Sequence, residues 1–217
     1  GTSPPATLFT VATTTNIFNV LSTGNVGIGT TTPQDALHVI GDIRTSACAS
    51  DGGGDVKCAD IAETYPASEY LEAGDVVMAD DSVLVTTSTR FAVRRATKDG
   101  GKPLLGIVST RPAILIEGEQ ARIGGPKVAS THAIGEKAPI ALVGRVPIKI
   151  SSENGEIKRG DPLAISSIPG TAAKATEPGW IVGVALEDDA QAKDGKIMAF
   201  VKPTWYGGVE IKKEESE

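Results

Sequence analysis

Apolar and polar positions alternate in short runs along this chain of 217 residues, and a helical period is hard to find. Alternation with a period of two is typical of strands that bury one face. Strand-like runs occur at Leu8–Val11, Ile17–Val20 and Ala36–Val39, and residues 145–150 alternate strictly. Asn154-Gly155, which lies between strand-like stretches, predicts a hairpin turn. The pattern, with frequent valine, isoleucine and threonine, predicts a mainly β protein.

The first 44 residues are expected to form an extended N-terminal β arm that ends in a glycine-rich junction. Such an arm would expose apolar side chains that a lone chain cannot bury on both faces. Identical chains could wind around one axis, or the arm could insert as a strand into a neighbouring subunit. A flexible leader with incidental apolar residues is the alternative. The residues assigned to assembly are Leu8, Phe9, Val11, Ile17, Phe18, Val20, Val26, Gly27, Ile28 and Gly29.

A change of composition marks the rest of the chain. Residues 45–59 are a Cys- and Gly-containing linker, residues 60–203 are expected to form a globular β domain, and residues 204–217 a polar tail. Within the domain the order Gly-Asp-apolar, basic-Ala-Thr and apolar-Gly-apolar occurs twice, at about 72–108 and 158–185. Self-similarity of this kind predicts a domain built from two related β units.

Charge and composition exclude several classes of function. The formal net charge is −6, so we expect no nucleic-acid partner. No apolar run approaches the roughly 20 residues that span a bilayer. We expect no cofactor and no metal: common enzyme motifs are missing, and His38 and His132 are isolated. The chain starts at Gly1 without an initiator methionine, as a processed protein or a fragment would.

The two cysteines, Cys48 and Cys58, flank the glycine-rich stretch Asp51–Asp55. A disulfide across this loop is sterically easy and would suit an extracellular protein. It would contribute about 2–3 kcal/mol by closing a short loop. Two unpaired thiols are the alternative.

One segment carries a specific resemblance. The run Asn25-Val26-Gly27-Ile28-Gly29-Thr30-Thr31-Thr32-Pro33, followed by Ala36-Leu37-His38-Val39, resembles a segment common in phage tail-fibre and bacterial surface-fibre proteins. The resemblance covers about residues 24–44. It implies a place in or beside a shaft of intertwined chains, and therefore assembly with copies of itself at a cell or virion surface.

A second segment is similar to another family. Asp60-Ile61-Ala62-Glu63, with its sequel to Pro112, resembles the autoproteolytic chaperone domains at the ends of some phage tail spikes. That resemblance implies self-cleavage, in which a carboxylate activates a hydroxyl or thiol beside the scissile bond. The catalytic candidates are Asp60, Glu63 and Cys58. Because Ala59, which precedes Asp60, has no nucleophile, we expect a structural cap and not an enzyme.

These observations favour an extracellular structural protein that assembles into a fibre, filament or spike through its N-terminal arm. The homo-oligomer could be a closed trimer or a helical filament. An autoproteolytic intramolecular chaperone domain of a tail-spike-like trimer is the first alternative. A glycan-binding adhesin tip is the second, because Trp180, Trp205 and Tyr206 could form an aromatic platform for surface glycans. Packing of these rings in a core or an interface is the more common arrangement.

Overall fold

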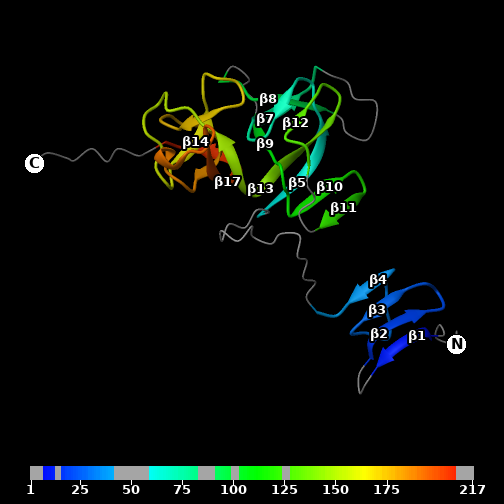
Figure 1. Cartoon of the computed structure of the whole chain (residues 1–217). Coiled ribbons are helices and arrows are strands. Elements are labelled where there is room, and N and C mark those ends of the chain that lie inside the picture. Colours follow the sequence, from blue (N-terminus) through cyan, green and yellow to red (C-terminus); the bar gives the residue numbers. More distant parts are fainter. Residues whose placement is uncertain are drawn as a thin grey trace, which may run out of the picture. The chain divides into compact units, whose positions relative to one another are not determined.

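Strands make up nearly all the regular structure, so the predicted mainly β class is confirmed. The chain divides into two compact units, Gly1–Thr45 and Ser46–Glu217 (Figure 1). A short 3-10 helix, η2 (Asp189–Gln191), lies between the last two strands. The structure, a computed structural model, describes residues 7–12, 16–41, 59–82, 91–98, 103–123 and 128–208.

The first unit is a four-stranded sheet with the order β1-β2-β3-β4. The first three strands are antiparallel neighbours, and the last runs parallel to β3. The segment predicted as an extended arm is thus folded back on itself within one chain. The strands are β1 (Thr7–Ala12), β2 (Asn16–Leu21), β3 (Val26–Ile28) and β4 (Leu37–Val39).

Contacts inside one chain account for two of the junction glycines. Gly27 faces Asn19 across β2 and β3, and a Cβ at Gly27 would lie 2.6 Å from the Asn19 Nδ2 and 2.4 Å from the Thr30 carbonyl oxygen. Gly29 has a φ of +75°, which disfavours any residue with a side chain. The glycine spacing therefore fits a tightly folded sheet and by itself requires no second chain.

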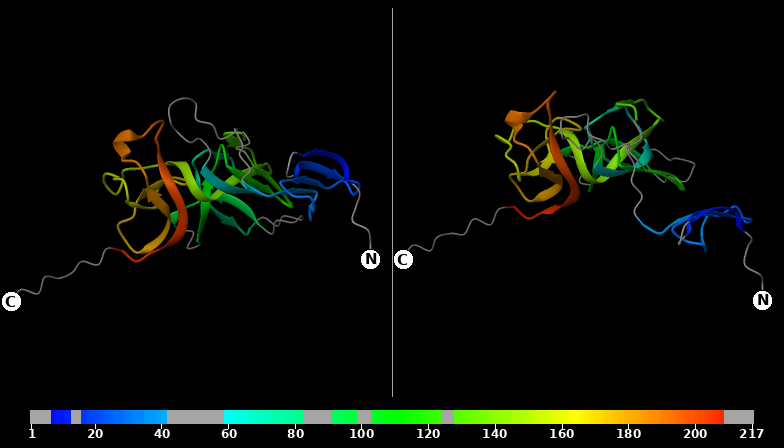
Figure 2. Two further views of the ribbon diagram at one scale, coloured as in Figure 1. Left: turned by 90° about the horizontal axis from the view of Figure 1, so that it is seen from below. Right: turned by 60° about the horizontal axis from the view of Figure 1, so that its bottom comes forward.

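The second unit contains an eleven-stranded sheet and a short two-stranded one. The long strand β13 pairs with β5, β9 and β17, and Figure 2 shows β17, orange to red, as a long curved strand. The strands are β5 (Ala59–Pro66), β6 (Leu71–Glu72), β7 (Val76–Asp80), β8 (Ala92–Arg95), β9 (Leu104–Val108), β10 (Ile114–Glu117), β11 (Gln120–Ile123), β12 (Thr131–His132), β13 (Lys137–Lys149), β14 (Pro162–Ile165), β15 (Ala172–Lys174), β16 (Gly179–Ala185) and β17 (Lys196–Tyr206).

Strand β7 supplies side chains to two hydrophobic cores. Val76 and Met78 belong to a core with Ile148, whereas Val77 belongs to one with Leu71. Successive side chains of a strand point to opposite faces, so β7 is buried on both. This explains why Val76-Val77-Met78 reads as a continuous apolar run and not as an alternation.

The two predicted repeats have the same strand pairing. In the first unit of the repeat, β7 lies between β8 and β9; in the second, β14 lies between β15 and β16. The register also corresponds, because Val77 faces Arg95 and Leu163 faces Lys174. All four pairings are antiparallel. The similarity seen in the sequence is therefore a similarity of backbone pairing.

Each unit of the repeat also has an irregularity in the same place, next to a glycine. The register shifts after Val77, which faces Gly106, and after Leu163, which faces Gly183. A Cβ at Gly106 would lie 2.1 Å from a carbonyl oxygen of β13, and one at Gly183 would lie 1.9 Å from a carbonyl oxygen of β17. Both glycines thus allow a neighbouring strand to approach closely.

The hairpin predicted at Asn154-Gly155 is wrong, although a turn is present. Gly155 has a φ of +95°, and its N–H donates to the Ser152 carbonyl oxygen at 2.9 Å. The flanking strands β13 and β14 do not pair with each other; β14 pairs with β15 and β16. The partners in the repeated unit outcompete the strand that is nearest in sequence.

Candidate functional site

One face of the N-terminal sheet is entirely apolar at its paired positions. Phe9 faces Val20 and Val11 faces Phe18 across β1 and β2, and the pairing continues across β3 and β4. Cross-strand partners project from the same face of a sheet. The residues of this apolar face are Phe9, Val11, Phe18, Val20, Val26, Ile28, Leu37 and Val39.

The first compact unit by itself leaves the apolar face open to solvent. Phe9 and Leu37 are each 56% exposed, and Val11 and Ile28 are also exposed. The other four side chains are half-buried, and the Phe9 and Phe18 rings touch edge to face with centroids 6.0 Å apart. Contiguous exposed apolar surface of this kind marks an interaction site on a soluble protein.

The opposite face of the same sheet is closed by the chain itself. Asn19 and Gly27 lie on that face and are buried, and so is Pro33 in the connection between β3 and β4. The Asn25 side-chain amide donates to the Pro33 carbonyl oxygen at 3.3 Å, which ties this connection down. The middle of this more polar face is therefore covered, although Thr10 at its edge is exposed, whereas the apolar face is left open, the reverse of a surface sheet on a monomer.

The residues assigned to assembly from the sequence fall into three environments. Sequence reasoning missed Leu37 and Val39, although the alternation of residues 36–39 had marked them as a strand. Of the residues assigned from the sequence, five are exposed, namely Leu8, Phe9, Val11, Ile28 and Gly29. Three are half-buried, namely Phe18, Val20 and Val26, and Gly27 is buried. The side chain of Ile17 lies outside the described part.

The two described catalytic candidates, Asp60 and Glu63, lie on opposite faces of β5. Asp60 shares the buried face with Ala62 and Thr64, whereas Glu63 is half-buried on the other face. The Tyr65 hydroxyl donates to the Glu63 Oε2 at 2.7 Å. Because the two carboxylates are three positions apart on a regular strand, they cannot act on one group from the same side.

Asp60 is nearly buried, with 4% of its surface exposed. Burial raises its pKa to about 6, while hydrogen bonds from the Ser109 hydroxyl and from the Asp60 N–H oppose the rise. Its Oδ2 lacks a hydrogen-bond partner among the described residues. A carboxyl group of this kind can hold a proton near neutral pH. Ser109, in the loop after β9, lies inside the stretch to Pro112 that carries the second resemblance, but sequence reasoning assigned it no role of its own.

Cys48 and Cys58 lie outside the described residues, so the disulfide and the role of Cys58 remain predictions. Within the described ranges, no cluster of histidine, cysteine, aspartate or glutamate side chains could hold a metal ion. Nor does any helix of these ranges have the length and apolar character that a membrane span needs.

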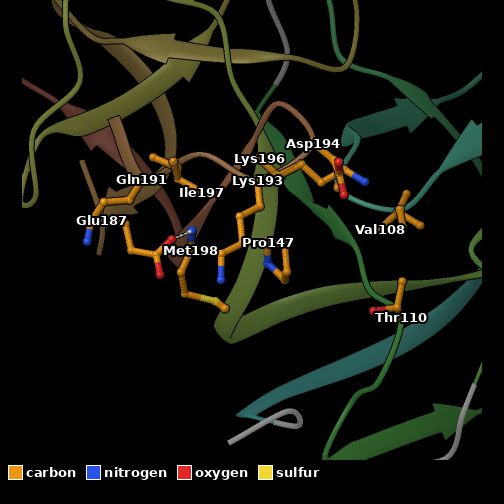
Figure 3. Close-up of a pocket in the computed structure, with 12 residues that line it drawn as sticks. Val108, Thr110, Pro147, Glu187, Gln191, Lys193, Asp194, Lys196, Ile197 and Met198 are labelled. Atoms are coloured by element: carbon orange, nitrogen blue, oxygen red, sulfur yellow. Dashed lines mark hydrogen bonds between the residues drawn. The ribbon is translucent and has the colours of Figure 1, made fainter. Parts of the chain in front are cut away.

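A cavity of about 340 Å³ lies beside η2 and the start of β17. Figure 3 shows Glu187, Gln191 and Met198 on one side of it and Val108 and Thr110 on the other. Glu187 is held in place, because its Oε2 accepts a hydrogen bond from the Met198 N–H at 2.8 Å. The lining of this cavity mixes acidic, basic and apolar residues.

No protein-family model matches the chain, and no curated protein matches it either. Among solved structures, it is similar to the C-terminal fragment of bacteriophage phi29 gene product 12, with a TM-score of 0.37, 16% identity and coverage of 65% of this chain and 98% of that fragment. It is also similar to the pre-mature phi29 gene product 12, with a TM-score of 0.45, 15% identity and coverage of 86% of this chain and 24% of that one. The chain thus spans about a quarter of the pre-mature protein. Both structures are of one phage protein, and likeness at this level carries no conclusion about function.

Proposed function

We propose that this chain is a structural subunit that assembles with copies of itself through the apolar face of its N-terminal sheet. The observation that supports this is the sidedness of the sheet: all eight paired positions on one face are apolar, and that face is open. The resemblance of residues 24–44 to fibre proteins points the same way. We place the assembly outside the cell or on a virion surface.

The energetic reason for assembly is the exposed apolar surface. Fully burying a side chain such as Val, Leu, Ile or Phe contributes about 1.5–3 kcal/mol. Four side chains of the face, Phe9, Val11, Ile28 and Leu37, are each about half exposed, so covering them supplies about 3–6 kcal/mol per sheet. Association costs an estimated 4–15 kcal/mol in lost freedom, which the combined sheets of two or three chains can offset.

Copies of the same chain suit this face better than a charged partner would. The face carries no charged side chain at any paired position. Among the described residues, the edge strand β1 has a paired neighbour on one side alone, so a strand from another copy can extend the sheet. A self-complementary contact gives a closed oligomer, and a contact that does not close gives a filament.

The test removes apolar character from this face in the full chain. We expect Phe9→Ser with Val11→Ser to convert the oligomer to monomers, as measured by sedimentation velocity and light scattering. The matched control is Ile123→Ser with Ile134→Ser, two positions in the second unit that are 66% and 72% exposed. An unchanged oligomer in the first variant, or a monomeric unmodified chain, would overturn the proposal.

A further inference from the structure

A second cavity, of about 520 Å³, lies in the second compact unit beside the start of β16 and the end of β17. Its walls come from β14, from the segment between β15 and β16 and from Thr97 and Lys98. Trp180 and Trp205 also line it. The volume falls within the range of about 300–1,000 Å³ that is typical of small-molecule sites.

The two tryptophans form an exposed pair. They face each other across β16 and β17, with ring centroids 6.0 Å apart and planes at 88°. Trp180 is 37% exposed and Trp205 is 59% exposed, so of the arrangements expected for these rings, packing in the core of this unit is excluded, while an interface and a sugar platform are not. An edge-to-face pair leaves at least one ring face free, and a large free aromatic surface is unusual on a monomer.

The two copies of the repeat differ at the position that Trp180 holds in the second. The repeat provides an internal comparison, because Gly106 and Gly183 hold the same place in the two pairings. Three residues before these glycines stand Pro103 in the first copy of the repeat and Trp180 in the second copy. Pro103 stands just before β9, whereas Trp180 lies in β16 and faces Trp205 in β17, so the tryptophan pair belongs to a part of the sheet that the first copy of the repeat lacks.

The rim of this cavity carries both donors and acceptors. The Lys98 Nζ lies 2.7 Å from the Glu153 Oε1, so the positive charge there is balanced. Thr176 and Glu177 are exposed at the wall. The Asn154 side-chain amide donates to the Lys174 carbonyl oxygen at 2.9 Å, which fixes Asn154 in the floor.

We propose that this cavity, here called the tryptophan cavity, binds a saccharide. The C–H face of a pyranose ring is apolar and can stack on an exposed indole, while its ring hydroxyls both donate and accept hydrogen bonds. Aromatic faces beside a few placed polar groups match this chemistry. A polyanion would need a surplus of cationic groups at the rim, and Lys98 is balanced by Glu153.

The chain offers a direct probe, because its two tryptophans are both in the tryptophan cavity. The full chain is titrated with maltotriose, lactose and N,N′-diacetylchitobiose while tryptophan emission is recorded, and labelled protein is applied to a glycan array. We expect a saturable change in emission with at least one of these sugars. Trp205→Ala is expected to weaken that binding by about tenfold or more, equivalent to roughly 1.4 kcal/mol. Trp205→Phe, which keeps an aromatic face, should retain part of it.

Two controls keep the result interpretable. Tyr70→Ala, at an exposed aromatic residue of the second compact unit that does not line the tryptophan cavity, should leave sugar binding unchanged. Thr176→Ala removes a rim hydroxyl and leaves both rings in place, and it should also weaken sugar binding. This variant tests the proposal if Trp205→Ala fails to fold. No saturable change with any sugar and no signal on the array would overturn the proposal. A change of oligomeric state in Trp205→Ala, with no sugar binding, would assign the cavity to a contact between copies instead.

Discussion

Replacing Asp60 with asparagine tests whether the buried carboxyl group in β5 destabilises the folded chain at neutral pH. Asparagine keeps the shape of the side chain and an oxygen that can accept the hydrogen bond from Ser109, but it cannot ionise. The pKa of Asp60 is raised from 3.8 to about 6. At about 1.4 kcal/mol per pKa unit, ionisation of the folded form lowers its stability by about 3 kcal/mol.

The sign of the effect follows from proton linkage. Between the two pKa values the folded chain binds more protons at Asp60 than the unfolded chain does, so stability falls as the pH rises through that window. Below the lower value both states are protonated and Asp60 contributes nothing. The free energy of unfolding of Asp60→Asn, minus that of the unmodified chain, should therefore increase by about 3 kcal/mol between about pH 3.5 and about pH 7.5.

Urea unfolding followed by tryptophan fluorescence measures this difference. Both tryptophans and Asp60 belong to the same compact unit, so the signal reports on the unit that contains the change. Burial lowers the pKa of His132, so protonation of His132 at acidic pH destabilises the folded chain. The pH dependence from His132 therefore has the opposite sign to that from Asp60. That contribution is common to both proteins and cancels in the difference if the two sites are independent.

Asp161→Asn is the matched control because its expected pH dependence has the opposite sign. The pKa of Asp161 is lowered, with burial opposing the change and Lys174, the Lys158 N–H and nearby positive charge favouring it. Asp161→Asn should lose stability at neutral pH, and the loss should fade as the pH drops. A difference for Asp60→Asn that stays flat with pH, or that has the sign of the Asp161 control, would refute the reasoning about Asp60.

Two further expectations follow from the described contacts. Gly106→Ala and Gly183→Ala should each destabilise the fold by about 2 kcal/mol or more, since the new Cβ would overlap a strand backbone; Gly179→Ala, with nothing within 4 Å, should be nearly neutral in the same urea assay. Intact-mass spectrometry of stored protein should show the full-length chain, and a fragment that begins at Asp60 would revive the self-cleavage alternative.

The sequence was sufficient to predict local features of the fold but gave little information about long-range pairing. The runs at Leu8–Val11 and Ile17–Val20 are strands as expected, because alternation reports one buried face. The same alternation cannot say which strand is the neighbour, so an extended arm was expected where β1 to β4 form one sheet. Asn154-Gly155 likewise predicts a turn from local geometry, whereas the partners of β14 follow β14 in the sequence.

For the candidate sites, too, the sequence predicts local features but not the long-range arrangement. That Leu8, Phe9 and Val11 belong to an exposed apolar segment follows from their order in the sequence. The sidedness of the sheet does not, since it depends on Pro33 and its connection closing the other face. The contact between Asp60 and Ser109 joins residues that are distant in sequence, and no spacing rule connects them.

The repeat separates residues that the fold requires from those that vary. In both copies of the repeat an aspartate at the turn accepts a hydrogen bond from the N–H of the residue three positions earlier. The distance is 2.8 Å for Asp75 and 2.8 Å for Asp161. The ion-pair partners are not equivalent, because Asp75 lies 2.7 Å from the Lys149 Nζ and Asp161 lies 2.8 Å from the Lys174 Nζ. The shared element is thus the hydrogen bond that shapes the turn, and the cation can come from different strands. Positions outside the pairing that the two copies share, such as Trp180 and Trp205 at the end of the β16–β17 pair, can serve binding without altering that shared pairing.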